Sequence, residues 1–124
     1  MTTIVFFREE DQSTPFLDWF DSLPVKAKVQ CRARLELLAE QGHLLRRPAA
    51  DYLRDDIYEL RAKAQGVNYR ILYFFHGRAA VVISHGLTKQ QVIVPPIEIE
   101  RARRRKQAFA ANPSRHTHVL REPL

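Results

Sequence analysis

Four stretches of the chain combine β-branched and aromatic residues in runs short enough to be strands. They cover residues 3 to 8, 56 to 63, 67 to 76 and 79 to 87. Gln65-Gly66 and His76-Gly77 separate the last three runs, and such pairs favour tight hairpin turns. These three runs therefore predict an antiparallel meander. The first run is short and isolated, and we expect it at a sheet edge.

Three other stretches repeat apolar residues every three or four positions, the period of a helix face. They cover residues 16 to 23, 25 to 41 and 97 to 109. Pro15 follows Ser13 and Thr14 as in a first helical turn, and Gly42 suits the residue after a helix end. The first two helices are expected to form a hairpin that packs on the sheet. The pattern thus predicts an α+β fold with a mainly antiparallel four-stranded sheet and a C-terminal helix.

The remaining segments lack a clear period. Residues 43 to 56 contain Pro48 and are interpreted as a connection, and residues 111 to 124 have little to bury. A chain of 124 residues is the size of one domain. We therefore expect a single domain over residues 1 to 110 and a flexible tail over residues 111 to 124.

Charge is divided unevenly along the chain, which has a formal net charge of +6. Residues 1 to 60 hold 8 Lys and Arg against 11 Asp and Glu, a net −3, whereas residues 61 to 124 hold 12 against 3, a net +9. The second half therefore suits a polyanion. Cys31 is the single cysteine, no Cys/His spacing resembles a zinc site, and no apolar run suits a membrane span or signal peptide. We expect a cytoplasmic protein without metal or cofactor.

Two arginines fall inside predicted strands, Arg61 in the second run and Arg70 in the third. Lys89 follows the fourth run. Because an unpaired buried guanidinium is very costly, these cations should face solvent and could offer three charges to one anionic ligand. Arg61 could instead form an ion pair with Glu59, two residues away on the same strand face. Arg70 has no acid close to it in the sequence.

Several motifs occur in an order known from one protein family. They are Leu53, Glu59-Leu60-Arg61, Tyr69-Arg70-Ile71-Leu72-Tyr73, His85-Gly86-Leu87-Thr88-Lys89, Pro95 and Ala102. With the order of elements, they make the chain resemble the RelE superfamily of toxins from bacterial toxin–antitoxin pairs, and within it the HigB-like, phage-derived branch. Leu87, Gln90 and Ile93 depart from that pattern, which has a phenylalanine and two further basic residues at these positions.

The resemblance implies a RelE-like fold and a ribosome-dependent messenger RNA endoribonuclease, or mRNA interferase, that inhibits translation. It also implies a cognate antitoxin, expected to be a helix-turn-helix protein that carries the chain to operator DNA. Gln90 and Ile93 make the cationic site weaker than the family pattern. They therefore favour an alternative, a catalytically weakened family member that binds its antitoxin and acts as a co-repressor of its own operon. A third hypothesis, based on charge alone, is a general nucleic-acid-binding protein.

RNA cleavage by the 2′-hydroxyl needs alignment, proton transfer and stabilisation of the phosphorane, with no required metal. Arg61 and Arg70 are assigned to the scissile phosphate, and Lys89 is either a third phosphate contact or a proton-transfer group. His85 is a candidate for proton transfer because an ordinary imidazole titrates near neutral pH. Tyr73 could stack on a base, but its strand position makes core packing the stronger interpretation.

The densest charge lies in the last predicted helix. Its basic residues are Arg101, Arg103, Arg104, Arg105 and Lys106. They could contact ribosomal RNA through its phosphates, form a solvated helix face, or dock an acidic partner.

Overall fold

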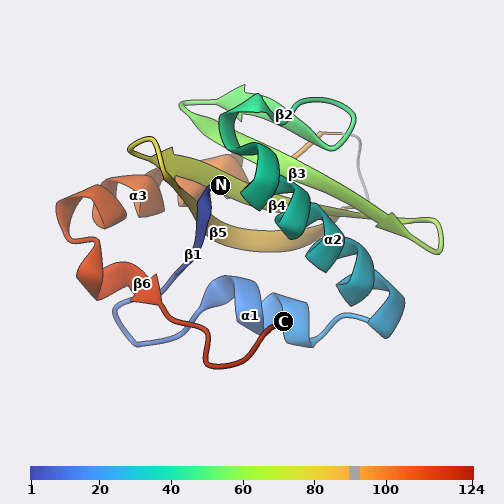
Figure 1. Ribbon diagram of the computed structural model, residues 1–124, viewed down its shortest axis with the longest axis horizontal. Helices are drawn as coiled ribbons and strands as arrows, with labels where there is room; N and C mark the ends of the chain where they lie inside the picture. The colour runs from blue at the N-terminus through green and yellow to red at the C-terminus, as the bar shows by residue number, and fades with distance from the viewer. Residues whose placement is uncertain (90–92) are drawn as a thin grey trace.

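The computed structural model describes residues 1–89 and 93–124, and at Lys89 it describes the backbone alone. The elements follow one another in the chain as shown in Figure 1. They are β1 (Thr3–Phe7), α1 (Pro15–Asp21), α2 (Val25–Gln41), β2 (Ala50–Arg54), β3 (Ile57–Ala64), β4 (Val67–His76), β5 (Ala80–Lys89), α3 (Pro96–Ala111) and β6 (Thr117–His118), with 3₁₀ turns at Gly42–Leu44 and Ser114–His116. The α+β prediction is confirmed.

One six-stranded sheet carries the fold, in the order β2-β3-β4-β5-β1-β6. Neighbouring strands are antiparallel except for β1 and β5, which run parallel with Thr3 opposite Ala80. The prediction that the first strand lies at an edge is therefore wrong, because β1 pairs on both sides. The sheet has six strands where four were expected, since β2 and β6 extend it.

The hairpin between β3 and β4 turns at Gln65 and Gly66, with φ values of 50° and 79°. Positive φ at both central residues matches the twist of the two strands, so the predicted hairpin turn is confirmed. From this turn the strands pair without a register shift as far as Tyr58 and Tyr73. The register places Arg61 directly opposite Arg70.

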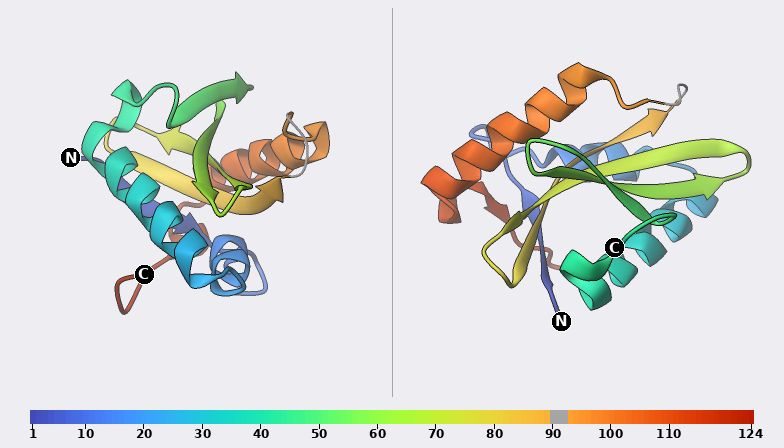
Figure 2. Two further views of the ribbon diagram at one scale, coloured as in Figure 1. Left: turned by 90° about the vertical axis from the view of Figure 1, so that its right-hand side faces the viewer. Right: turned by 90° about the horizontal axis from the view of Figure 1, so that it is seen from above.

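Helices cover both faces of the sheet, α1 and α2 on one side and α3 on the other (Figure 2). The molecule has two hydrophobic cores, and alternation along β4 contributes to each of them. Ile71 and Tyr73 face α1 and α2 in the first core, whereas Leu72 and Phe74 face α3 in the second core. Cys31 of α2 is buried in the first core, and burial raises its pKa to about 11. The thiol is thus protonated at neutral pH, as expected of a structural cysteine.

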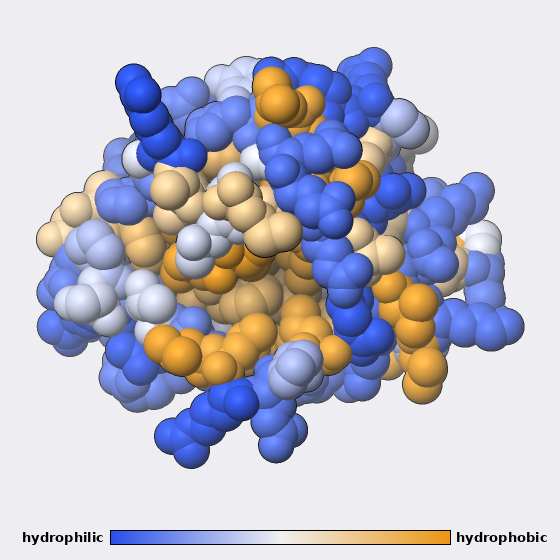
Figure 3. Space-filling view, viewed as in Figure 1, coloured by the Kyte–Doolittle hydropathy of each residue, from blue (hydrophilic) through white to orange (hydrophobic). Residues whose placement is uncertain are grey.

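Two segments expected to lack structure contribute to the sheet. Ala50 of β2 is fully buried because it pairs with Leu60, and His116 is buried where β6 joins β1. After β6, Leu120 and Leu124 pack against the first core, and Figure 3 shows apolar surface in this region of the molecule. The prediction that residues 111 to 124 have little to bury is therefore wrong for these residues. Within the described residues, no helix is both long and apolar enough to cross a membrane.

Candidate functional site

The two strand-borne arginines lie side by side on the face of the sheet that α3 partly covers. Arg61 of β3 is paired with Arg70 of β4, and directly opposite residues of antiparallel strands share a face. The side chain of Arg61 is 31% exposed and that of Arg70 is 12% exposed. The expectation that neighbouring strands bring these cations together is confirmed, although Arg70 is more covered than a freely solvated arginine.

Glu59 lies beneath both guanidinium groups, with a side chain only 3% exposed. Its Oε2 accepts a hydrogen bond from Arg61 Nε at 2.9 Å, and its Oε1 lies 3.3 Å from Arg70 Nε. The predicted ion pair with Arg61 is confirmed. Arg70 also has an acidic neighbour, which its own strand does not reveal because the contact crosses from β3. Burial lowers the pKa of Arg70, Glu59 opposes this effect, and Arg61 lowers it further.

A second carboxylate extends the cluster onto β2. Asp51 Oδ2 lies 2.7 Å from Arg47 Nη2 and 3.3 Å from Arg61 Nη2. The hydrogen bond from Arg47 holds the pKa of Asp51 below its ordinary value. The sequence did not point to Asp51, because residues 43 to 56 were expected to be a connection and not a strand beside β3.

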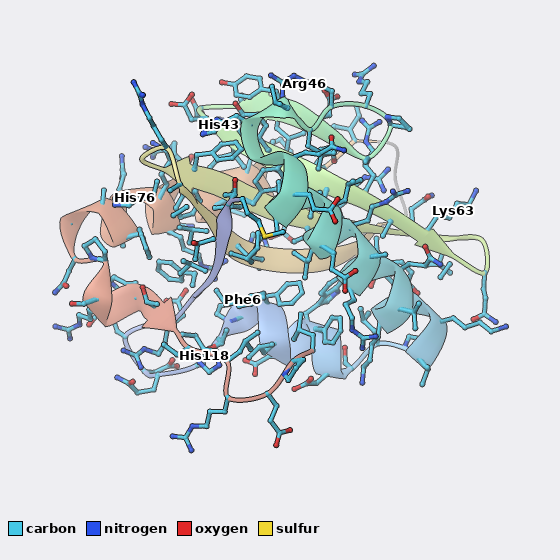
Figure 4. The ribbon with its side chains drawn as sticks, viewed as in Figure 1. Phe6, His43, Arg46, Lys63, His76 and His118 are labelled. Carbon is cyan, nitrogen blue, oxygen red and sulfur yellow. The ribbon has the colours of Figure 1, made fainter. Side chains whose placement is uncertain are left out.

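Lys63 is a further cation that was not singled out from the sequence. It lies two residues after Arg61 on β3, so strand alternation places it on the same face, opposite Asn68. Its side chain is exposed and extends from the outer end of the hairpin (Figure 4). The same two-residue spacing that flagged Glu59 beside Arg61 could have identified Lys63.

Lys89 is the last residue of β5, and its backbone pairs with Asn68, two residues from Arg70. The sequence expectation that it belongs to the neighbouring strand is confirmed for the backbone. Its side chain and Gln90 lie outside the described residues, so their contribution to the site stays a prediction. Ile93 is exposed.

His85 lies on the same face but is held in a network with α3. Its Nδ1 lies 2.9 Å from Arg105 Nη1 and 2.8 Å from Ser84 Oγ, and its Nε2 lies 3.4 Å from Glu98 Oε1. A guanidinium only donates, so Nδ1 accepts and the proton resides on Nε2. Burial, reinforced by Arg105 and opposed by Glu98, lowers the pKa of His85 to about 4.

The reason for choosing His85 as a proton-transfer group, a pKa near neutrality, is therefore wrong. The side chain is 10% exposed, and both ring nitrogens face protein groups. In this arrangement the imidazole lacks a free lone pair for a general base. Its evident structural role is to connect β5 with α3.

This network predicts a pH dependence of stability. His85 has a folded pKa of about 4 and an ordinary value of 6.5, so the unfolded chain takes up the proton first as the pH falls. Stability from the neutral imidazole is present above about pH 6.5 and is lost towards pH 4. Between pH 7 and 4.5 the free energy of unfolding should fall by about 2 kcal/mol more in the wild type than in His85→Gln.

Urea unfolding at each pH measures this difference. The nearby charged groups Glu9, Glu98, Arg101 and Arg105 are present in both proteins, so the comparison isolates the contribution of His85. Parallel pH curves for the two proteins would show that His85 is not buried in its neutral form.

Tyr73 is not available for base stacking. Its side chain is buried, with 1% of the residue exposed, and its ring stacks on Tyr58 at a centroid distance of 5.4 Å. Strand alternation directs the Tyr73 side chain to the face covered by α1 and α2, whereas Arg70 lies on the other face of the sheet. The core-packing interpretation is confirmed, and the RNA-contact role predicted for Tyr73 is wrong.

The basic residues of α3 are mostly paired with acids. Arg101 contacts Glu98, Arg103 contacts Glu100, and Arg105 Nε donates to Glu9 Oε1 at 2.8 Å. The ion pairs Arg101–Glu98 and Arg103–Glu100 are partly exposed, and such pairs contribute little stability. Arg104 is exposed and Lys106 is half-buried. The run therefore presents less free positive charge than the sequence suggests, and Arg105 mainly anchors α3.

The site thus consists of two arginines aligned over a buried carboxylate, with Lys63 further towards the end of the hairpin. Two adjacent guanidinium groups form a surface that matches the oxygens of a phosphate or carboxylate. In the part of the chain that the structure describes, no three His, Cys, Asp or Glu side chains come together as a metal site.

Comparison with known proteins adds a family to this geometry. A family model described as Phage derived protein Gp49-like (DUF891) matches residues 18–107, from α1 to most of α3. None of the curated proteins matches the chain. The matched region includes both arginines, Glu59 and His85, and it spans well over half of the sequence. The chain therefore belongs to the Gp49-like family of phage-derived proteins, a RelE-like toxin family of toxin–antitoxin systems.

Proposed function

We propose that the chain is a toxin of the HigB-like branch that cleaves messenger RNA on the translating ribosome without a metal ion. The observation that carries this proposal is the register of β3 and β4, which aligns Arg61 and Arg70 on one partly open face. Two guanidinium groups in this position can hold two oxygens of one phosphate. The toxin family to which the chain belongs supports a cognate antitoxin.

The proposed reaction uses the nucleophile that RNA itself carries. The 2′-hydroxyl oxygen bonds to the adjacent phosphorus as its proton leaves, and the bond from phosphorus to the 5′ oxygen breaks. The departing 5′ oxygen takes up a proton, which leaves a 2′,3′-cyclic phosphate and a 5′-hydroxyl. Arg61 and Arg70 stabilise the added negative charge on the phosphorane. Lys89 is proposed as the third phosphate contact or the proton-transfer group.

Cations outside the pair would attract the RNA backbone. Lys63 continues the line of Arg61 towards the end of the hairpin, and Arg104 and Lys106 lie on α3. These residues are proposed to hold ribosomal or messenger RNA through phosphates, which makes binding salt-dependent. The antitoxin is proposed to be a helix-turn-helix protein that covers the cationic face in the cytoplasm.

Cleavage on purified ribosomes programmed with a short messenger RNA tests the proposal. We expect cuts within the codon in the ribosomal A site, with a 2′,3′-cyclic phosphate on the upstream fragment. Arg61→Ala and Lys89→Ala should each slow cleavage by about 10-fold or more, since each removes a charged contact to the phosphate.

Arg78→Ala is the matched control, because Arg78 is an exposed arginine in the turn between β4 and β5. It should cleave at the wild-type rate. Intact messenger RNA in every codon context, from a protein shown to be folded, would refute the ribonuclease proposal.

The buried carboxylate favours a second candidate function. Glu59 and Asp51 already neutralise part of the arginine charge, which would suit a weakened enzyme that binds its antitoxin and represses their shared operon. In that case, adding the chain should tighten the antitoxin's hold on operator DNA while transcripts stay intact. Transcript ends that map inside codons would contradict this candidate.

A further inference from the structure

Glu59 occupies an unusual place for an acid. Its side chain is 3% exposed, between two cations and next to the second core, where Leu72 is fully buried opposite it. A buried carboxylate needs charged or hydrogen-bonding partners. Here both partners are arginines on the face of the sheet that α3 partly covers. One acid shared by two arginines leaves the trio with a net positive charge.

We propose that Glu59 is the positioning residue of this site, which holds Arg61 by a hydrogen bond to Nε and Arg70 by an ion pair at Nε, so that the outer nitrogens of both arginines bind one RNA phosphate. The inference rests on the proposed function for the nature of the ligand. It assigns to the buried acid the alignment of the arginines and not a chemical step.

The hydrogen bonds of the two arginines support this assignment. Arg61 uses Nε for Glu59 and Nη2 for Asp51, and Arg70 uses Nη1 for the carbonyl oxygen of Tyr69 at 3.1 Å. Within the described residues, Arg61 Nη1 and Arg70 Nη2 donate to no protein group. One terminal nitrogen of each arginine is therefore left for a ligand.

The contacts of Glu59 with Arg61 and with Arg70 are not equally tight. Arg61 Nε makes a hydrogen bond to Glu59 at 2.9 Å, whereas Arg70 Nε and Glu59 Oε1 are 3.3 Å apart and make none. Both of these atoms are buried without another partner. Such a pair is incompletely satisfied, so Glu59 holds Arg70 less firmly than Arg61.

A role for Glu59 as general base does not fit its surroundings. A base must come within hydrogen-bond reach of the 2′-hydroxyl, but both carboxylate oxygens face guanidinium nitrogens and almost none of the side chain is exposed. Positioning and base roles also differ in their pH profiles. Loss of a base removes the acidic limb of the rate profile, whereas misaligned arginines lower the rate at every pH.

Two variants separate geometry from charge. Glu59→Gln keeps the shape but offers only one acceptor oxygen, so it can serve one arginine. Glu59→Asp keeps the charge but is one methylene shorter, so it cannot reach both Nε atoms. We expect each variant to lower the single-turnover cleavage rate on programmed ribosomes by about 30- to 100-fold. The ribosome concentration that gives half of the maximal rate should stay within about 3-fold of wild type, and the pH profile of the rate should be unchanged.

Binding of inorganic phosphate gives a measurement that does not depend on cleavage. The Nε–H resonances of Arg61 and Arg70 in the NMR spectrum should shift together on titration in the wild type, with one dissociation constant. In both variants the affinity should fall by about 10-fold. Glu40→Gln, which removes an exposed carboxylate of α2, is the matched control and should behave like the wild type.

The possible results distinguish this inference from the proposed function. Wild-type cleavage and phosphate affinity in Glu59→Asp, a folded protein by its thermal midpoint, would overturn the positioning role and leave the ribonuclease in place. A wild type that cleaves nothing but binds phosphate in a Glu59-dependent way would overturn the ribonuclease and support the positioning role. Loss of the acidic limb in Glu59→Gln would identify Glu59 as a base and overturn the inference.

Discussion

Arg70→Ala should lower the rate of messenger RNA cleavage on the ribosome by about 100- to 1,000-fold, the usual effect of removing one group that stabilises transition-state charge. Arg70 is the better buried of the two arginines, at 12% exposure against 31% for Arg61, so its interaction with a phosphate is less screened by water. Cleavage kinetics in single turnover measure the loss. A rate within a few-fold of wild type would exclude Arg70 from the reacting phosphate.

The same substitution should also destabilise the fold, because it leaves Glu59 buried with Arg61 alone. Breaking a buried pair in this way costs about 3 kcal/mol or more. Arg70→Lys separates the two effects, since it keeps a positive charge near Glu59 but loses the planar fork. We expect this variant to be folded and still impaired in cleavage. Thermal unfolding of both variants beside Arg78→Ala checks the structural part.

Gly86→Ala should cost about 3 kcal/mol or more in the free energy of unfolding, comparable to the cost expected for Arg70→Ala. Gly86 lies in β5 opposite Ile71, and a Cβ atom there would overlap ring carbons of Trp19 from α1. The Trp19 ring cannot easily move, because it packs against Phe16 at 5.8 Å and Tyr69 at 6.2 Å between centroids. The denaturant midpoint measures the effect.

A double-mutant cycle identifies the cause. With the smaller side chain of Trp19→Leu, the added methyl group has space, so Gly86→Ala should cost much less there than in the wild type. Equal costs in both backgrounds would show that Trp19 is not the obstacle. The glycine of the His85-Gly86 motif is thus explained by a helix that packs on the sheet, independently of any reaction.

The fold was largely predictable where local pattern and structure agree. The strand predicted at 67 to 76 and the helix predicted at 25 to 41 have the bounds of β4 and α2, because long apolar periods and flanking glycines mark them. β2 and β6 were missed, since neither has a distinct pattern and both form only by pairing with a neighbouring strand. The position of β1 inside the sheet depends on its parallel pairing with β5, which no local pattern encodes.

The sequence was sufficient to predict the cations of the candidate site, but it did not predict all of the acidic residues that pair with them. Arg61 and Arg70 stood out because charges inside strands need an explanation. Glu59 could be connected to Arg61 by alternation on one strand, but its contact with Arg70 depends on the register between two strands. The sequence could not predict the state of His85, because its low pKa depends on burial and on Arg105, which α3 brings to it in the folded protein.

The position of β1 has a consequence for how the chain emerges during synthesis. Residues Thr3–Phe7 are made before both partner strands, Ala80–Lys89 and Thr117–His118, and before the helices and strands that lie between them in the sequence. Pairings so distant in sequence form slowly and only after the intervening residues are present. The nascent polypeptide therefore leaves the exit tunnel with its first strand unpaired. The six-stranded sheet can therefore be completed only after Thr117–His118 has left the ribosome.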